Sequence, residues 1–115
     1  MAKNKNHNIR FRIWLYAGDE KLLGIGRVEL LEKIKETGSI TSAAKLMKMS
    51  YRQAWQMVSE MNERSNQPLV EKHLGGKSGG GAIVTDAGIN AIANFKKLER
   101  TISVFIKKES KKMKI

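Results

Sequence analysis

The stretch "SITSAAKLMKMSYRQAWQMVSEMN", residues 39–62, predicts two helices joined by a tight turn at Lys48 and Met49. Ser39 and Ser50 stand where an N-cap side chain accepts a backbone N–H, and Gln53 completes a capping box with Ser50. Apolar residues recur at helical spacing in both segments: Ile40, Ala43, Ala44 and Met47, then Ala54, Met57, Val58 and Met61. The paired alanines leave room for another helix to pack closely.

The second helix starts with polar and basic residues that lie away from this apolar stripe. Two helices joined by a short turn are typical of a helix-turn-helix reader, whose second helix enters the major groove of DNA. Arg52 suits guanine O6 and N7, and Gln53 or Gln56 suits adenine N6 and N7. The alternative is an ordinary surface helix. The net charge and the hairpin that follows favour the reader.

The composition indicates a polyanionic partner. The 115 residues include 22 Lys and Arg against 11 Asp and Glu, a net charge of +11, which attracts nucleic acid or an acidic membrane surface. No apolar run approaches the roughly 18 residues of a membrane span, and the N-terminus lacks the apolar core of a secretory signal. The absence of cysteine excludes disulfides and thiolate sites. We therefore expect one cytoplasmic domain without membrane contact.

The residue patterns of enzymes and metal sites are missing. His7 and His73 have no carboxylate or second histidine at a ligand spacing. Glu29, Glu32 and Glu36 lie among lysines, as on the solvated face of a helix. We expect neither catalytic residues nor a metal site, and therefore not an enzyme.

The glycine-rich stretch "HLGGKSGGGAIVT", residues 73–85, has two interpretations. Gly76, Lys77 and Ser78 match the end of a nucleotide-binding loop, but Glu71 stands where its first glycine belongs. Three glycines then replace the helix that would hold the nucleotide phosphates. We instead expect strands over 68–74 and 81–85, with the glycines and Lys77 at a tip that contacts a sugar–phosphate chain. A merely flexible turn is the alternative.

The flanking patterns predict a first hairpin and two further helices. "IRFRIWLY", from Ile9 to Tyr16, alternates as a strand does, and "KLLG" can return as its partner. The helix after it is expected to end at Gly38, with an apolar face of Val28, Leu30, Leu31 and Ile34. Thr85 can cap a last helix that runs to about Lys108.

This last helix carries an apolar stripe longer than the core of so small a domain can cover, and we expect a second chain to cover it. The stripe has six members: Ile89, Ile92, Phe95, Leu98, Ile102 and Phe105. The alternative is that the helix folds back on its own domain, with the strand from Ile9 to Tyr16 as its cover.

Residues 30–62 and 69–88 resemble the N-terminal DNA-binding domain of ModE-type molybdate-responsive transcription regulators, itself similar to the LysR-type winged helix. The resemblance runs from about Ile9 to about Arg100, and its most specific elements are Gly38-Ser39-Ile40, Ser50-Tyr51, Ala54-Trp55, Met61-Asn62 and the glycines around Lys77. It implies that Ser50, Tyr51 and Arg52 start the recognition helix. It also implies a wing at Lys77, Trp55 as a buried anchor between helix and hairpin, and a dimer on a two-fold DNA site.

The chain departs from this family at its C-terminal end. Full-length regulators of the type carry C-terminal domains that bind molybdate or tungstate, whereas this chain ends at Ile115 after a basic run. We therefore expect no cofactor and do not extend molybdate or tungstate binding to it.

Together these features predict an α+β fold: a winged helix-turn-helix with an N-terminal β-hairpin and a long C-terminal helix. We expect residues 1–115 to form one domain, with basic tails at 1–8 and 109–115. The expected function is transcription regulation by a homodimer that binds double-stranded DNA sequence-specifically; the alternative is nonspecific nucleic-acid binding. The expected DNA contacts are Ser39, Thr41, Ser42, Ser50, Tyr51, Arg52, Gln53, Gln56, Gly76, Lys77, Ser78, Gly79 and Gly80.

Overall fold

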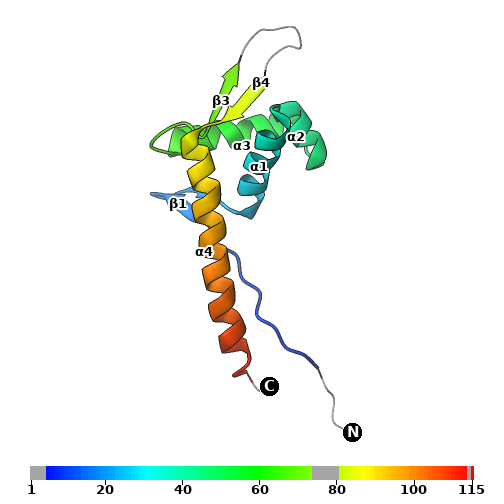
Figure 1. Cartoon of the computed structure of the whole chain (residues 1–115), viewed down its shortest axis with the longest axis vertical. Helices are drawn as coiled ribbons and strands as arrows, with labels where there is room; N and C mark the ends of the chain where they lie inside the picture. The colour runs from blue at the N-terminus through cyan, green and yellow to red at the C-terminus, as the bar shows by residue number, and fades with distance from the viewer. Residues whose placement is uncertain (1–4, 74–80, 114) are drawn as a thin grey trace.

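The computed structural model describes residues 5–73, 81–113 and 115. Its elements, in chain order, are β1 (Leu15–Ala17), β2 (Glu20–Leu23), α1 (Ile25–Thr37), α2 (Ile40–Leu46), α3 (Tyr51–Arg64), β3 (Val70–His73), β4 (Gly81–Val84) and α4 (Asp86–Ser110). Strands β1 and β2 form one antiparallel hairpin, and β3 and β4 form another. Figure 1 shows β3–β4 above helices α1–α3, with α4 running from this hairpin past β1 to the opposite end. The predicted α+β fold, with its N-terminal hairpin and long C-terminal helix, is confirmed.

Capping residues set the breaks between the first three helices. Gly38 ends α1 with φ 69°, a left-handed conformation that glycine adopts without steric cost. At the start of α2, the Ser39 hydroxyl accepts the N–H of Ser42 at 3.1 Å. At the start of α3, the Ser50 hydroxyl accepts the N–H of Gln53 at 3.1 Å. The predicted caps are confirmed, and they fix where α2 and α3 turn relative to α1.

The core lies where α1, α2 and α3 meet the β3–β4 hairpin and the first half of α4. Ala43 and Ala44 are 0% and 2% exposed, so the small residues of α2 let it pack closely against its neighbours, as predicted. The largest fully buried side chains come from α1 and α3: Leu30, Leu31, Ile34, Val58 and Met61. Burial of these apolar groups is the main stabilising contribution.

Asn62 on α3 fastens the β3–β4 hairpin to the helices. Its Oδ1 accepts the backbone N–H groups of Leu69 at 2.8 Å and Val70 at 3.1 Å, and its Nδ2 donates to the Val70 carbonyl at 2.9 Å. From the second strand, the N–H of Ala82 donates to the Gly38 carbonyl at 2.9 Å. The base of the hairpin is therefore held by both α3 and the end of α1.

We expect Asn62→Ala to lower the free energy of unfolding by about 1–3 kcal/mol, because it leaves backbone groups of Leu69 and Val70 without their partners. Urea denaturation measures the change. Asn90→Ala is the matched control, because Asn90 is exposed on α4 and its loss should change stability by less than about 0.5 kcal/mol. Equal effects of the two substitutions would contradict the role given to Asn62.

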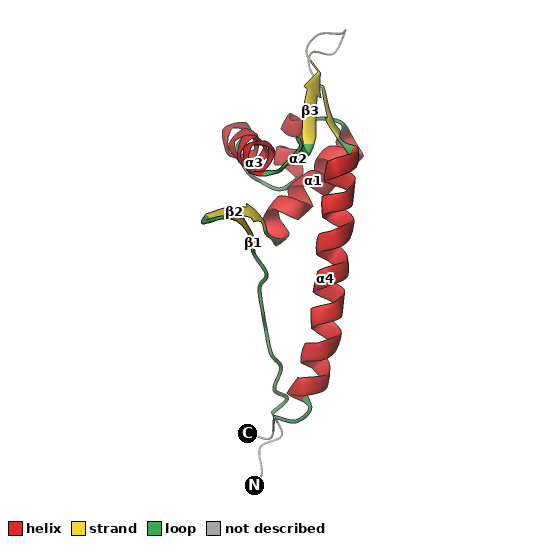
Figure 2. Cartoon of the chain, turned by 90° about the vertical axis from the view of Figure 1, so that its left-hand side faces the viewer, coloured by secondary structure: helices red, strands yellow, loops and turns green. Residues whose placement is uncertain are grey.

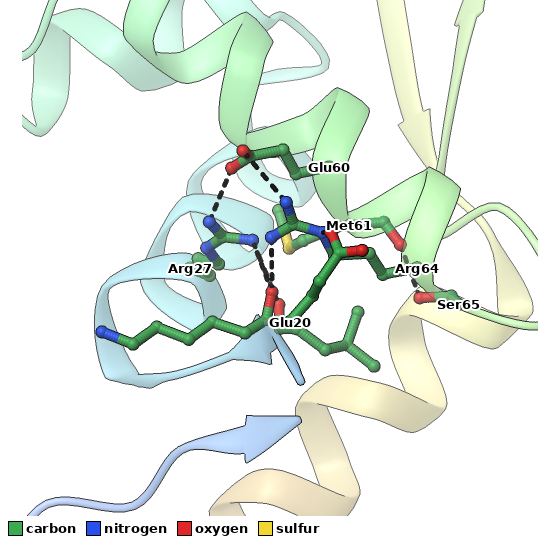
Figure 3. Close-up of polar contacts among 8 residues, drawn as sticks. Glu20, Arg27, Glu60, Met61, Arg64 and Ser65 are labelled. Carbon is green, nitrogen blue, oxygen red and sulfur yellow. Dashed lines mark hydrogen bonds and ion pairs between the residues drawn. The ribbon is translucent and has the colours of Figure 1, made fainter. Parts of the chain in front are cut away.

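A charged network fixes the C-terminal end of α3 to α1 and to the first hairpin (Figure 3). Glu60 pairs with Arg27 at 2.7 Å and with Arg64 at 3.4 Å. Arg64 also pairs with Glu20 at 2.7 Å and donates to the carbonyl of Lys21 at 2.8 Å. Because Arg27 and Arg64 are engaged within the domain, they hold α3 in place at its C-terminal end.

The predicted strand from Ile9 to Tyr16 is wrong over most of its length. Pairing begins at Leu15, opposite Leu23, because the partner strand β2 spans only four residues before the chain turns into α1. Residues 9–14 have no regular secondary structure. In Figure 2 this segment runs from β1 toward the end of the molecule where α4 terminates.

Helix α4 extends well beyond the core. Thr85 caps it by accepting the N–H of Gly88 at 3.1 Å, as predicted. Its buried residues, Gly88, Ile92 and Phe95, all lie in the first half of its 25 residues, a length of about 37 Å. Figures 1 and 2 both show the second half projecting past α1–α3. None of the described helices, α4 included, combines the length and the apolar character that crossing a membrane requires.

Candidate nucleic-acid interface

The N-terminal half of α3 presents polar side chains to solvent. Four residues predicted as DNA contacts are exposed there: Tyr51, Arg52, Gln53 and Gln56. Ala54 and Val58 on the opposite side are fully buried, which fixes the rotation of the helix about its axis. The predicted contact residues of this helix therefore share one accessible surface.

The serines and the threonine predicted as contacts fall into two groups. The hydroxyls of Ser39 and Ser50 each accept a backbone N–H as helix caps, so they shape the surface by placing α2 and α3. Thr41 and Ser42 are exposed in the first turn of α2. Their side chains extend the polar surface of α3 onto the neighbouring helix.

A groove of about 280 Å³ lies between the starts of these two helices and the end of the β3–β4 pairing nearest the hairpin tip. Its polar lining comes from three elements: Ser39 and Thr41 at the start of α2, Tyr51 at the start of α3, and Lys72 and His73 on β3. The structure thus brings three predicted contact residues together with two residues of the hairpin. Among the residues that the structure describes, no Asp or Glu lines this groove.

Lys72 is a site residue that our sequence reasoning missed. Its Nζ lies 4.1 Å from the centre of the Trp55 ring, a cation–π contact between β3 and α3. Burial removes part of the water around the ammonium group and so lowers the pKa of Lys72 below its ordinary value. The alternation of side chains along a strand could have predicted its position. Lys72 lies on the same face of β3 as buried Val70, but nearer the hairpin tip.

Trp55 is not the buried anchor that the resemblance implied. Its side chain is 44% exposed and meets the hairpin through Lys72 rather than through the core. Trp55 follows Tyr51 by four residues, so both lie on one face of α3. The resemblance was right about the elements that Trp55 connects and wrong about its burial.

The segment from Thr37 to Ser59, which holds α2 and the N-terminal part of α3, is positive or neutral throughout. No Asp or Glu occurs between Glu36 and Glu60, whereas Lys45, Lys48 and Arg52 do. Within the described part of the chain, none of these three forms an ion pair, unlike Arg27 and Arg64 at the other end of α3. Helix α2, the turn after it and the first turn of α3 therefore carry unneutralised positive charge, which attracts an anionic partner.

The tip of the second hairpin lies outside the described residues. Pairing of β3 with β4 is described as far as His73 opposite Gly81. Five predicted contact residues fall in between: Gly76, Lys77, Ser78, Gly79 and Gly80. Their contact with DNA stays a prediction.

A second candidate surface lies along α4. Ile92 and Phe95, predicted at a dimer interface, are buried in the core of their own domain, so they are not available to a second chain. The remaining stripe residues are exposed or half-buried: Ile89, Leu98, Ile102 and Phe105. Leu98 also borders an apolar groove of about 390 Å³ between α4 and the β1–β2 hairpin.

Helix α2, a turn, an exposed helix α3 and an antiparallel hairpin define a winged helix-turn-helix domain. Residues 25–89, more than half of the chain, match the family of bacterial regulatory helix-turn-helix proteins of the lysR type. The chain belongs to this family. Its matched segment covers all of α1 to β4, which includes the exposed half of α3 and the groove beside it.

The chain is also similar to molybdenum-related regulators, as the sequence resemblance predicted. It is 44% identical to the transcriptional regulator ModE of Haemophilus influenzae over 75 residues, which are 65% of this chain and 29% of that protein. It is 47% identical to the ModE dual regulator of Escherichia coli over 62 residues, 54% of this chain and 24% of that protein. Over 93 residues, 81% of this chain and 34% of the relative, it is 38% identical to the molybdenum-pterin-binding protein MopB of Rhodobacter capsulatus. The chain thus spans about a third or less of these relatives.

Proposed function

We propose that this domain binds double-stranded DNA sequence-specifically as a homodimer and regulates transcription, with α3 in the major groove and the β3–β4 hairpin on the DNA backbone. The carrying observation is the exposed, basic N-terminal half of α3, which is positioned by a cap at Ser50 and contains no Asp or Glu. Such a helix presents its first turns to base edges. The family membership supports the same conclusion.

Arg52 is the residue we assign to base recognition. It is exposed in the first turn of α3 and free of ion pairs in the part of the molecule the structure describes. A guanidinium group can donate two parallel hydrogen bonds to guanine, which ammonium cannot reproduce. Gln53 and Gln56 lie on the same exposed surface and suit adenine.

We expect Arg52→Ala to lose about 1–3 kcal/mol of binding free energy on the preferred site and to relax one base position. Fluorescence anisotropy with labelled duplexes measures the loss on specific and random DNA. Arg52→Lys is the matched control, because it keeps the charge and should preserve binding to random DNA while losing discrimination. If Arg52→Ala lost the same binding free energy on both duplexes, Arg52 would contact a phosphate and not a base.

The dimer is proposed from the second half of α4. Leu98 is 45% exposed and Phe105 is 62% exposed, and with Ile102 they fall at helical spacing on one side of the helix. Residues 11–14 border a groove together with Phe95 and Glu99, in the first part of the helix and its middle. The same stripe of a second copy would bury these side chains and place two α3 helices on one face of DNA.

Nonspecific nucleic-acid binding is the alternative function that the same positive charge would support. Competition binding separates the two, because a specific regulator prefers its operator over random duplex by about a thousandfold or more. The proposal includes no catalysis and assigns no cofactor to this domain. Molybdenum-pterin binding, stated in the name of the relative MopB, is not extended to it.

A further inference from the structure

We propose that Trp55 is a positioning residue that holds Lys72 beside the groove between α2, α3 and β3, so that Lys72 binds one backbone phosphate of duplex DNA there. This inference rests on the proposed function. It assigns one contact of the protein–DNA interface, between Lys72 and a backbone phosphate. Our term for the arrangement of Trp55, Lys72 and Tyr51 is the β3 clamp.

The side chain of Lys72 links strand β3 to helix α3. Lys72 Nζ lies 4.1 Å from the centre of the Trp55 ring, and Lys72 also lines the groove. A free lysine side chain samples many rotamers, and the loss of this conformational entropy opposes binding. The contact with Trp55 restricts that freedom before DNA arrives, so less of this entropy is lost on binding.

The chemistry of the groove suits a phosphodiester. Lys72 supplies the cation, and Tyr51 and Thr41 supply hydroxyl donors. The neighbouring carboxylate, Glu71, is not among the described residues that line the groove.

The position of the groove fits the same docking geometry. Tyr51 belongs both to the groove lining and to the exposed N-terminal half of α3. A phosphate bound in the groove therefore lies beside the bases that Arg52 faces, on the side toward the hairpin. Phosphate contacts of this kind fix the register of the protein on DNA without reading sequence.

The test measures how binding depends on salt. Anisotropy titrations with a random-sequence duplex, at several salt concentrations, give the slope of log K against log salt for each variant. Lys72→Ala should lower the slope by about one and weaken binding by about five- to tenfold at 0.1 M salt, as expected for one lost phosphate contact. Lys97→Ala is the matched control, because Lys97 is an exposed lysine on α4 away from the groove, and it should leave the slope unchanged.

Trp55 is tested without changing the charge of the protein. Trp55→Leu should lower the salt slope nearly as much as Lys72→Ala, and the double variant should lose little more, because both substitutions remove the same contact. Trp55→Phe keeps an aromatic face and should restore the slope. Urea denaturation of each variant separates this effect from a loss of folding, since a purely structural role would change stability and leave the slope unaltered.

A phosphate scan locates the contact. On the selected operator, replacing single phosphates by neutral methylphosphonates should reveal one position per half-site that weakens the wild-type protein and has no further effect on Lys72→Ala. Wild-type slopes for Trp55→Leu, or equal slopes for Lys72→Ala and Lys97→Ala, would overturn the β3 clamp while leaving the proposed function intact. A wild-type protein that binds no duplex would overturn both.

Discussion

Replacing both Ile102 and Phe105 by aspartate is expected to convert a dimer of this domain into a folded monomer and to weaken operator binding by roughly 10²–10⁴-fold, the usual contribution of a second linked binding module. Phe105 is 62% exposed and Ile102 half-buried, so neither belongs to the core and the monomer should remain folded. Two aspartates facing their copies across a two-fold axis would repel and could not be solvated.

Sedimentation equilibrium measures this change directly. The double variant should sediment near the 13.0 kDa of one chain, and the wild type at twice that mass. Ser103→Asp with Val104→Asp is the matched control, because it adds the same charge on other faces of α4 and should keep the dimer. A wild-type protein that is monomeric at tens of micromolar would contradict the dimer.

Gly88→Ala is expected to lower the free energy of unfolding by about 1–3 kcal/mol, although alanine normally stabilises a helix by about 1 kcal/mol relative to glycine. Gly88 is buried where α4 begins against the second hairpin. An added Cβ would overlap the carbonyl oxygen of Leu69 and lie 2.6 Å from Cγ1 of Val84. Helix and hairpin would have to separate, which disturbs the base of the wing.

Gly26→Ala serves as the control for this prediction. Gly26 lies in the first turn of α1, and a Cβ added there meets no atom within 4 Å among the described residues. Its substitution should leave stability unchanged or raise it by up to about 1 kcal/mol. Urea midpoints compare the two variants, and a Gly88→Ala protein as stable as Gly26→Ala would show that α4 does not approach β3 this closely.

The helix-turn-helix was predictable from sequence because its signals are local. Ser39, Ser50 and Thr85 each cap the helix that follows them, and Gly38 ends α1, all as predicted. The small alanine side chains of α2 were enough to predict that another helix packs closely against it. Capping and helical spacing depend on residues within about one turn of each other. The amino-acid sequence alone is therefore enough to predict both.

Features that depend on a distant partner were harder to predict. The alternation from Ile9 to Tyr16 predicted a strand over that whole range, but it could not show that β2 is too short to pair with more than Leu15–Ala17. Likewise, the stripe on α4 was visible, but which of its members the core would bury depended on the packing of Ile92 and Phe95 against other elements. Lys72 was missed because its partner, Trp55, lies on a separate element.

Sequence-specific recognition by a two-fold dimer is the central claim, and selection of bound duplexes from a random DNA pool tests it most directly. The account predicts enrichment of a palindromic consensus whose half-sites are centred about 10–10.5 base pairs, or a multiple of that, apart. Arg52→Ala should relax one position in each half-site of that consensus. A pool that stays random through repeated rounds, although the protein binds duplex in a salt-dependent way, would contradict the claim and establish a nonspecific binder instead.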